Sequence, residues 1–411
     1  MGDGKPTAST FSLFRRYFWK PPRAHGEVIE DRSVSFLELF YDLVYVVVIA
    51  RAAHTLAEHV SWRGAADFAV VFGLIWIAWL NGTMYHDLHG RQDGRTRTFV
   101  FIQMTLLALL AVFTSEATGA DGAPFALTYA AFLVVLTWLW YSVRRQDSEE
   151  YSGITGPYLA GMIASITVVA MSAALSDNAR LVVWAIVVVG WVVGGISLQR
   201  LQIEGTDLGL TPTDSLVERF GLFTIIVLGE VVVGAVEGIS DGERTTLAIV
   251  TGMIGLNIGF AFWWTYFDFV GDRRPRTDGG RLAHWIFGHL PTTMSIAAVG
   301  AAMVSLVEHA ADDRAPAASA WLLSGAVALG LVSLISIVRA LSDYVRFPTV
   351  YGPLTWGLAL AAGTSILVGA LRPAPWLLAL LLVAVLSTVW LFAIGLWVKN
   401  GDPDTHIPAT D

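Results

Sequence analysis

Acidic and basic side chains stand inside apolar runs of this sequence, where an ionisable group costs at least a few kcal/mol and needs an explanation. Glu38, Asp42 and Tyr45 recur at spacings of four and three residues, which places them on one face of a helix. Arg51 and His54 share roughly the opposite face of the same helix. Carboxylates within a membrane are typical of proton- or cation-binding positions. The first apolar run is therefore a candidate ion-binding element.

A second run, residues 215–237, repeats the theme. Glu218 and Arg219 stand at its start, and Glu230 follows about a dozen residues later. At a rise of 1.5 Å per residue, Arg219 and Glu230 are about 16 Å apart and cannot pair. Glu230 then needs another partner or must hold a proton. Flanking glycines either allow close helix contact or leave space for a ligand; a purely structural ion pair is the competing interpretation.

Further titratable groups lie near the predicted inner side. Asp268 ends one apolar run, and His284 and His289 begin the next, where Pro291 is expected to kink the helix. Acid and histidine groups at one depth can pass protons, because histidine titrates near neutral pH. Metal binding is the weaker interpretation, since no HExxH or comparable ligand spacing occurs. The sequence predicts no metal site.

The elements that carry these residues are predicted to span a membrane. The chain has 411 residues, of which 55% are hydrophobic and 15% charged, whereas soluble domains are about one quarter charged. Uncharged runs such as 181–198 and 376–397 are long enough to cross a hydrocarbon core of about 30 Å. We therefore predict an all-α integral membrane protein of about 12 transmembrane helices. The predicted spans are 36–58, 64–85, 98–116, 124–141, 156–175, 181–199, 215–237, 246–269, 282–308, 318–338, 351–371 and 375–398.

Lys and Arg alternate between the connections of these spans. The N-terminal tail, the even-numbered connections and the C-terminal tail hold 19 of them, whereas the odd-numbered connections hold 5. Short cytoplasmic connections are enriched in Lys and Arg. The count therefore predicts that both termini are cytoplasmic.

Matching segments predict an internal repeat. Residues 37–49 and 217–230 both contain a Glu followed two residues later by a Phe, and weaker likeness continues through the next two spans. Six spans per half is an even number, so the halves are expected to be parallel repeats. The predicted division is a tail 1–35, a first half 36–200, a linker 201–213, a second half 214–398 and a tail 399–411.

Several classes of function lack their signatures in the sequence. The absence of cysteine excludes disulfides, thiolate metal sites and a cysteine nucleophile. No GxxxxGK[ST] or GxSxG motif occurs, and no basic patch resembles a nucleic-acid site, so we expect no cofactor and no nucleic acid. Tryptophans near the predicted span ends, Trp62 and Trp79 among them, are expected to be interfacial anchors.

The segments 36–54 and 218–234 resemble the bacterial low temperature requirement protein A (LtrA) family. The likeness rests on the patterns E-L-F-[FY]-D-L-V-[FY]-V and E-R-F followed by G-E, and residues 287–304 resemble the H-L-P-containing helix of that family. It extends over most of the chain from about 33 to 398. The resemblance implies a multi-pass protein of the bacterial plasma membrane. It also implies these signature positions: Glu38, Asp42, Glu218, Arg219, Glu230 and His289.

The favoured hypothesis is a proton- or cation-coupled secondary transporter of a small solute, in contact with the lipid bilayer. The substrate- or ion-binding candidates are Glu38, Asp42, Tyr45, Glu218, Arg219, Glu230, Asp268 and His289. Three alternatives stay open: a non-transport protein in cold adaptation, either a sensor or a membrane organiser; a membrane-embedded lipid-modifying enzyme; and a channel. An enzyme is less favoured than a non-enzyme, and homo-oligomerisation stays open.

Overall fold

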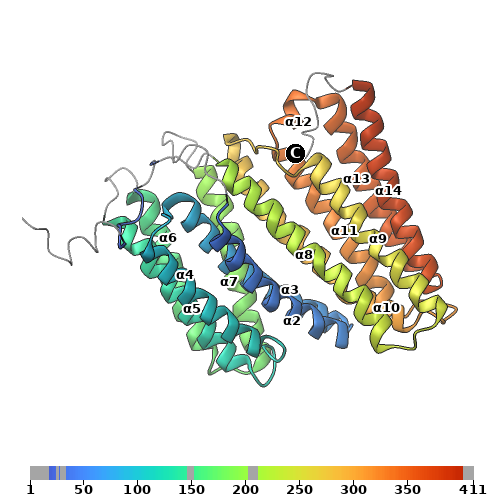
Figure 1. Ribbon diagram of the computed structural model, residues 1–411, viewed down its shortest axis with the longest axis horizontal. Coiled ribbons are helices and arrows are strands. Elements are labelled where there is room, and N and C mark those ends of the chain that lie inside the picture. The colour runs from blue at the N-terminus through green and yellow to red at the C-terminus, as the bar shows by residue number, and fades with distance from the viewer. Residues whose placement is uncertain (1–17, 25–26, 28–33, 146–151, 202–211, 401–411) are drawn as a thin grey trace, which may run out of the picture.

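The computed structural model describes residues 18–24, 27, 34–145, 152–201 and 212–400. Within these residues the regular elements are helices, and strand pairing is limited to an isolated bridge between Pro275 and Leu341. The long helices run side by side, and their connections alternate between the two ends of the bundle (Figure 1). They are α2 (Phe36–Glu58), α3 (Trp62–His89), α4 (Gly94–Thr114), α5 (Gly122–Arg144), α6 (Ser152–Ser172), α7 (Asp177–Leu201), α8 (Asp214–Asp241), α9 (Thr246–Phe269), α10 (Arg281–Glu308), α11 (Ala317–Ala340), α13 (Pro348–Leu371) and α14 (Pro375–Asn400). Two short helices, η3 (Asp278–Gly280) and α12 (Asp343–Arg346), lie in connections.

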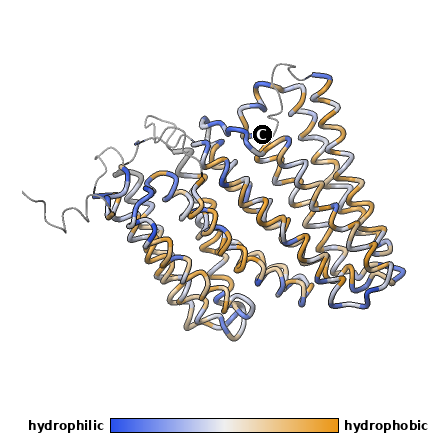
Figure 2. Tube along the Cα trace, in the orientation of Figure 1, coloured by the Kyte–Doolittle hydropathy of each residue, from blue (hydrophilic) through white to orange (hydrophobic). Residues whose placement is uncertain are grey.

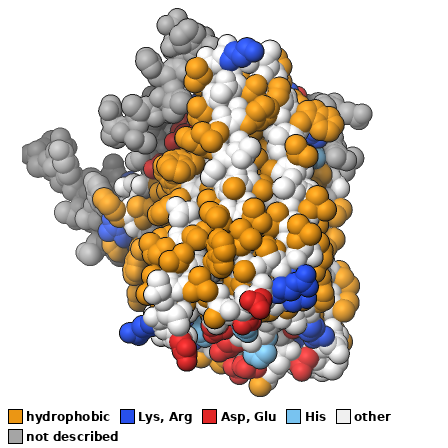
Figure 3. All heavy atoms as spheres, turned by 90° about the vertical axis from the view of Figure 1, so that its right-hand side faces the viewer, with side chains coloured by type: hydrophobic (Ala, Val, Ile, Leu, Met, Phe, Trp, Pro, Cys, Tyr) orange, Lys and Arg blue, Asp and Glu red, His pale blue; other side chains and the backbone are white. Residues whose placement is uncertain are grey.

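Eleven of these helices, all the long ones except α2, are long and apolar enough to cross a membrane. Hydrophilic residues gather at the two ends of the bundle, and apolar residues fill its middle (Figure 2). Hydrophobic side chains also cover the middle of the face in Figure 3, with charged side chains toward its ends. The chain is therefore a multi-pass α-helical membrane protein, as predicted.

Each predicted span coincides with one long helix, and the ends agree within a few residues. The twelfth, α2, carries Glu38, Asp42 and Arg51. Its 23 residues give a length of about 34 Å, enough to cross a bilayer. That α2 crosses too stays a prediction.

Capping residues mark where α2 and α8 begin, and α10 packs at the centre of the bundle. Ser35 caps α2 in a reciprocal capping box with Glu38, and Thr213 caps α8 by accepting a hydrogen bond from the Leu216 amide. α10 runs on through Pro291 without ending. It packs against α2, α3, α7, α8, α9 and α11. α10 is accordingly the central helix of the bundle.

α8 and α10 cross closely at a pair of glycines. A Cβ atom added to Gly234 would lie 2.0 Å from the carbonyl oxygen of Gly300. One added to Gly300 would lie 2.3 Å from the carbonyl oxygen of Glu230. The flanking glycine at Gly229 instead has nothing within 4 Å. Glycine thus serves helix contact at 234 and not at 229, a distinction the sequence left open.

We expect Gly300→Ala to destabilise the chain by about 1–3 kcal/mol, because the new methyl group meets backbone rather than a flexible side chain. Gly325→Ala on α11 is the matched control, since its Cβ would meet nothing within 4 Å. The melting temperature of the purified protein in detergent measures the difference. Equal melting temperatures for the two variants would contradict the close crossing.

Candidate functional site

A buried ion pair joins α2 to α8. Arg219 donates from Nε to Oδ2 of Asp42 at 3.2 Å and from Nη2 to Oδ1 at 2.9 Å. Asp42 is 0% exposed and Arg219 2% exposed. Two parallel charge-assisted bonds hold both side chains in one orientation. The structure thus brings together two predicted site residues that are 177 positions apart.

Glu38 adds a second carboxylate to this pair. Its Oε1 lies 3.8 Å from Nη1 of Arg219. Its Oε2 accepts hydrogen bonds of 2.9 Å from the amide and the hydroxyl of Ser35. Glu38 therefore both begins α2 and contributes negative charge beside Arg219, so part of its role is structural.

Trp79 on α3 completes the polar cluster. Its indole Nε1 donates to Oδ1 of Asp42 at 2.9 Å. Its ring stacks on Phe223 of α8, with centroids 4.0 Å apart and planes 22° apart. The prediction that Trp79 is an interfacial anchor is wrong, because Trp79 is 0% exposed, whereas Trp62 is 80% exposed. Helix α3 continues to His89, beyond the predicted end at 85, which places Trp79 well inside it.

Tyr45 lies one step from the ion pair. Its hydroxyl is 3.2 Å from that of Tyr41, and both residues are 0% exposed. The Tyr41 ring lies 5.7 Å from the guanidinium carbon of Arg219. Tyr45 therefore reaches the cluster through Tyr41 and, within the described residues, makes no hydrogen bond to Asp42.

His289 forms a separate, neighbouring pair. Its Nε2 lies 2.8 Å from the Tyr266 hydroxyl, and its Nδ1 lies 2.7 Å from the Trp285 carbonyl oxygen. A carbonyl accepts only, so Nδ1 carries the proton and Nε2 accepts from the tyrosine. The Phe220 ring contacts both His289 and Trp79. An aromatic ring, not a polar chain, thus separates His289 from Asp42.

The remaining acidic candidates near this end lie apart. Glu218 accepts a hydrogen bond from the Val34 amide at 3.2 Å. Asp268 accepts one from Nε1 of Trp390 on α14 at 2.6 Å. His284 bonds the Gly280 carbonyl oxygen through Nδ1. The structure therefore does not bring Glu218, Asp268 and His284 together with Asp42.

Glu230 lines a different site, a pocket of about 230 Å³ among α2, α8 and α10. It is 5% exposed, and within the described residues its carboxylate has neither a hydrogen bond nor an ion pair. As predicted, it does not pair with Arg219. The pocket is lined by Ala50, Arg51, Ala53, His54, Ala57, Glu230, Val233, Gly234, Glu237, Gly300, Ala301 and Val304. His54 lies 3.7 Å from Glu237 and 3.5 Å from Glu58 at its rim.

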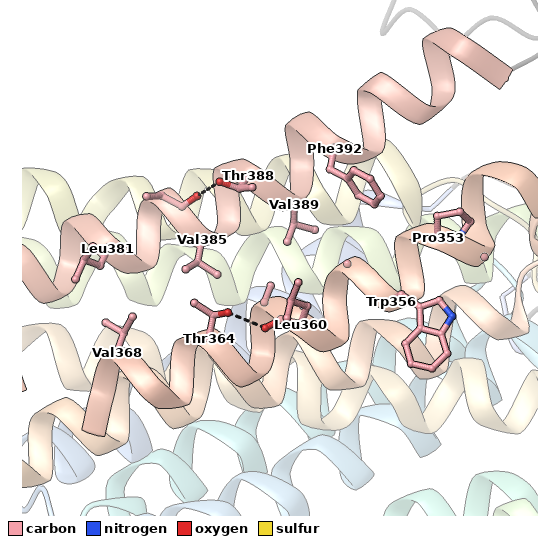
Figure 4. A pocket seen from close by; sticks show the side chains of 14 residues that line it. Pro353, Trp356, Leu360, Thr364, Val368, Leu381, Val385, Thr388, Val389 and Phe392 are labelled. Carbon is pink, nitrogen blue, oxygen red and sulfur yellow. Dashed lines mark hydrogen bonds between the residues drawn. The ribbon is translucent and has the colours of Figure 1, made fainter. Parts of the chain in front are cut away.

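A larger cavity of about 940 Å³ lies between α13 and α14 (Figure 4). Its lining is apolar, with Trp356 and Leu360 largely exposed. The hydroxyls of Thr364 and Thr388 bond carbonyls of their own helices, at 2.9 Å and 2.7 Å. Among the described lining residues, the indole Nε1 of Trp356 is the side-chain polar group left to orient a ligand, so this groove offers a mainly apolar surface to the membrane.

Over the part of the chain that the structure describes, no three His, Cys, Asp or Glu side chains gather as a metal site. The candidate functional residues thus form two sites, the Asp42–Arg219 cluster at one end of the bundle and the Glu230 pocket toward the other end.

Comparison with known families gives a match over most of the chain. The family model described as bacterial low temperature requirement A protein (LtrA) matches residues 33–389, which contain both sites. The chain belongs to the LtrA family. A curated relative, described as an uncharacterized protein of Rhizobium meliloti (strain 1021), is 26% identical over 293 residues, covering 64% of this chain and 67% of the relative. No solved structure gives a significant match.

Proposed function

We propose that this LtrA family protein is a proton- or cation-coupled secondary transporter of a small solute in the bacterial plasma membrane, with both termini cytoplasmic. The observation that carries the proposal is Glu230, a buried carboxylate without a protein partner that lines a cavity. A carboxylate in this position must be stabilised by a proton, a cation or a ligand. Glu230 is accordingly the proposed coupling group.

Helix pairing supports two repeated halves. In the first, α2 packs on α3 and α4, and α4 packs on α5. In the second, α8 packs likewise on α9 and α10, and α10 on α11. The contacts of α6 with α5 and α7 correspond to those of α13 with α11 and α14, and α3–α7 corresponds to α9–α14. The same order of packing in both halves favours parallel repeats, the arrangement of many transporters.

The two polar sites lie at different depths between these halves. Asp42 and Arg51 are nine residues apart on α2, or about 13 Å along its axis. Between the sites, the buried faces carry Ile49 on α2, with Phe223 and Val227 on α8. We infer that these side chains form an apolar layer that closes the route between the pocket and the ion pair. In the predicted orientation the pocket lies toward the outer side, and the ion pair holds the halves together on the inner side.

Transport then requires the apolar layer to open while the halves rock against each other. Because Asp42 is on one half and Arg219 on the other, their bonds oppose separation on the inner side. Binding of a proton, cation or solute at Glu230 supplies the differential interaction that shifts the equilibrium.

One observation favours the non-transport alternative. Asp42 and Arg219 pair with each other in a packed core, as expected of charges that only fix helix packing, although Nη1 of Arg219 has no hydrogen-bond partner among the described residues. The lipid-modifying enzyme is not proposed, because Asp42 at 0% and His289 at 1% exposure cannot meet a lipid unless the core opens.

The test has two stages. Metabolite comparison of deletion and overexpressing strains identifies solutes whose levels change, and uptake of these solutes is then measured in proteoliposomes under an imposed pH or cation gradient. We expect gradient-driven uptake, reduced at least about tenfold by Glu230→Gln, since loss of one buried charged interaction exceeds about 1.4 kcal/mol. Glu308→Gln, an exposed acid on α10, is the control and should transport normally.

Unchanged uptake by Glu230→Gln would remove Glu230 from coupling. Absence of gradient-driven uptake of every solute that changes in the strains would overturn the transport proposal.

A further inference from the structure

The pocket at Glu230 presents opposite charges from two helices. Glu230 reaches it from α8 and Arg51 from α2. Within the described residues, neither side chain has an ion pair, and the two are not within 4.0 Å of each other. The pocket is therefore lined by a carboxylate and a guanidinium that do not pair with each other, and by a second carboxylate, Glu237, which lies 3.7 Å from His54.

We propose that this pocket binds a small zwitterion of α-amino-acid size, with its ammonium group on Glu230 and its carboxylate on Arg51. This proposal names the class of solute for the proposed function. It rests on that function only in treating the bound ligand as the transported solute. Binding itself does not depend on transport.

Burial explains the assignment of the ammonium group. Glu230 is 5% exposed, so its carboxylate has lost most of its hydration. Such a carboxylate costs several kcal/mol unless an opposite charge or hydrogen-bond donors meet it. An ammonium group provides three donors and the opposite charge. Arg51 is exposed, and its planar guanidinium can take a carboxylate through two hydrogen bonds.

The remaining walls restrict the ligand. Apart from Arg51 and His54, the α2 side offers Ala50, Ala53 and Ala57. The α10 side offers Gly300, Ala301 and Val304 and adds no polar side chain. The volume of about 230 Å³ is several times the roughly 30 Å³ of one water molecule and accepts a compact molecule with a short apolar side chain.

The charges disfavour simpler ions. A bare cation bound at Glu230 would share the pocket with the Arg51 guanidinium. A bare anion bound at Arg51 would face Glu230 and Glu237. Like charges in one desolvated pocket repel each other, whereas a zwitterion places the correct charge at each end. His54 is held at the rim by Glu237 and Glu58 and is not needed for this recognition.

The test is equilibrium binding to the full chain purified in nanodiscs, with alanine and leucine as zwitterions, ethylamine and propionate as half-ligands. Each amino acid should bind at least about tenfold more tightly than either half-ligand, because each half-ligand leaves one charge unpaired. Glu230→Gln should weaken amino acid binding at least about tenfold. Arg51→Gln should weaken amino acid binding by a similar factor and should not weaken ethylamine binding, because it removes a charge that repels the cation. Arg314→Gln, an exposed arginine outside the pocket, should bind like the parent.

Melting curves check that each variant folds, and Arg51 is exposed, so its replacement leaves the core intact. Equal binding of amino acids and half-ligands, binding insensitive to both substitutions, or no binding of any probe at millimolar concentration would overturn the zwitterion site. Binding without gradient-driven uptake would sustain the site and contradict transport. Uptake of other solutes without binding of these probes would support transport and contradict the zwitterion site.

Discussion

Asp42→Asn is expected to destabilise the protein by about 3–5 kcal/mol, because it leaves the Arg219 guanidinium buried without its counter-ion. Arg219 is 2% exposed, and its other charged neighbour, Glu38, stands at 3.8 Å. Guanidinium cannot be neutralised by losing a proton under ordinary conditions, whereas a carboxylic acid can be neutralised by gaining one. Arg219→Met should therefore cost less than Asp42→Asn.

The double variant Asp42→Asn/Arg219→Met separates the interaction energy of the pair from the contribution that each residue makes on its own. Removing both charges abolishes the uncompensated burial, so the double variant should be more stable than Asp42→Asn alone. Melting temperatures in detergent, measured for the parent and the three variants, give the coupling. Additive losses would contradict a direct Asp42–Arg219 interaction.

Trp79→Ala is the second large expected effect, a destabilisation of about 3–5 kcal/mol. The substitution removes a fully buried indole that stacks on Phe223 and donates to Asp42. Trp79→Phe keeps an aromatic ring but loses the donor, so we expect a smaller loss of about 1–3 kcal/mol.

Trp62→Ala is the matched control, because Trp62 is 80% exposed at the start of the same helix. Its replacement should change stability by less than about 0.5 kcal/mol. Melting curves of the three variants test the order. Similar losses for Trp62→Ala and Trp79→Ala would restore the interpretation of Trp79 as an interfacial anchor.

The helices could be predicted from the sequence because lipid leaves the backbone few choices. A chain in hydrocarbon must satisfy its amides within each segment, so the length of an apolar run largely fixes a helix. Spans 36–58 and 246–269 were predicted with the bounds that α2 and α9 have. The helical rise within one segment also predicts, correctly, that Arg219 and Glu230 are too far apart to pair.

The partners across helices could not be predicted in the same way. Asp42 and Arg219 were both candidates, but nothing local fixes how α2 and α8 are rotated toward each other. The prediction that Trp79 is an interfacial anchor is wrong for a related reason, because burial depends on neighbouring helices that the sequence does not specify. The Glu230 pocket likewise needs α2, α8 and α10 together, and Arg51 was placed on its helix without being assigned to the site.

The proposed alternating access is tested most directly by cysteine labelling in the apolar layer. The chain has no cysteine, so a single Ile49→Cys reports without background. Ile49 is 1% exposed and lies between Asp42 and the pocket on the buried face of α2. Leu386→Cys, in the 0% exposed core of α14, is the control. A membrane-impermeant thiol reagent should label Ile49→Cys from the outer and from the inner side of membrane vesicles, and Leu386→Cys from neither. Absence of Ile49→Cys labelling from both sides would contradict transport and favour a rigid, non-transporting bundle.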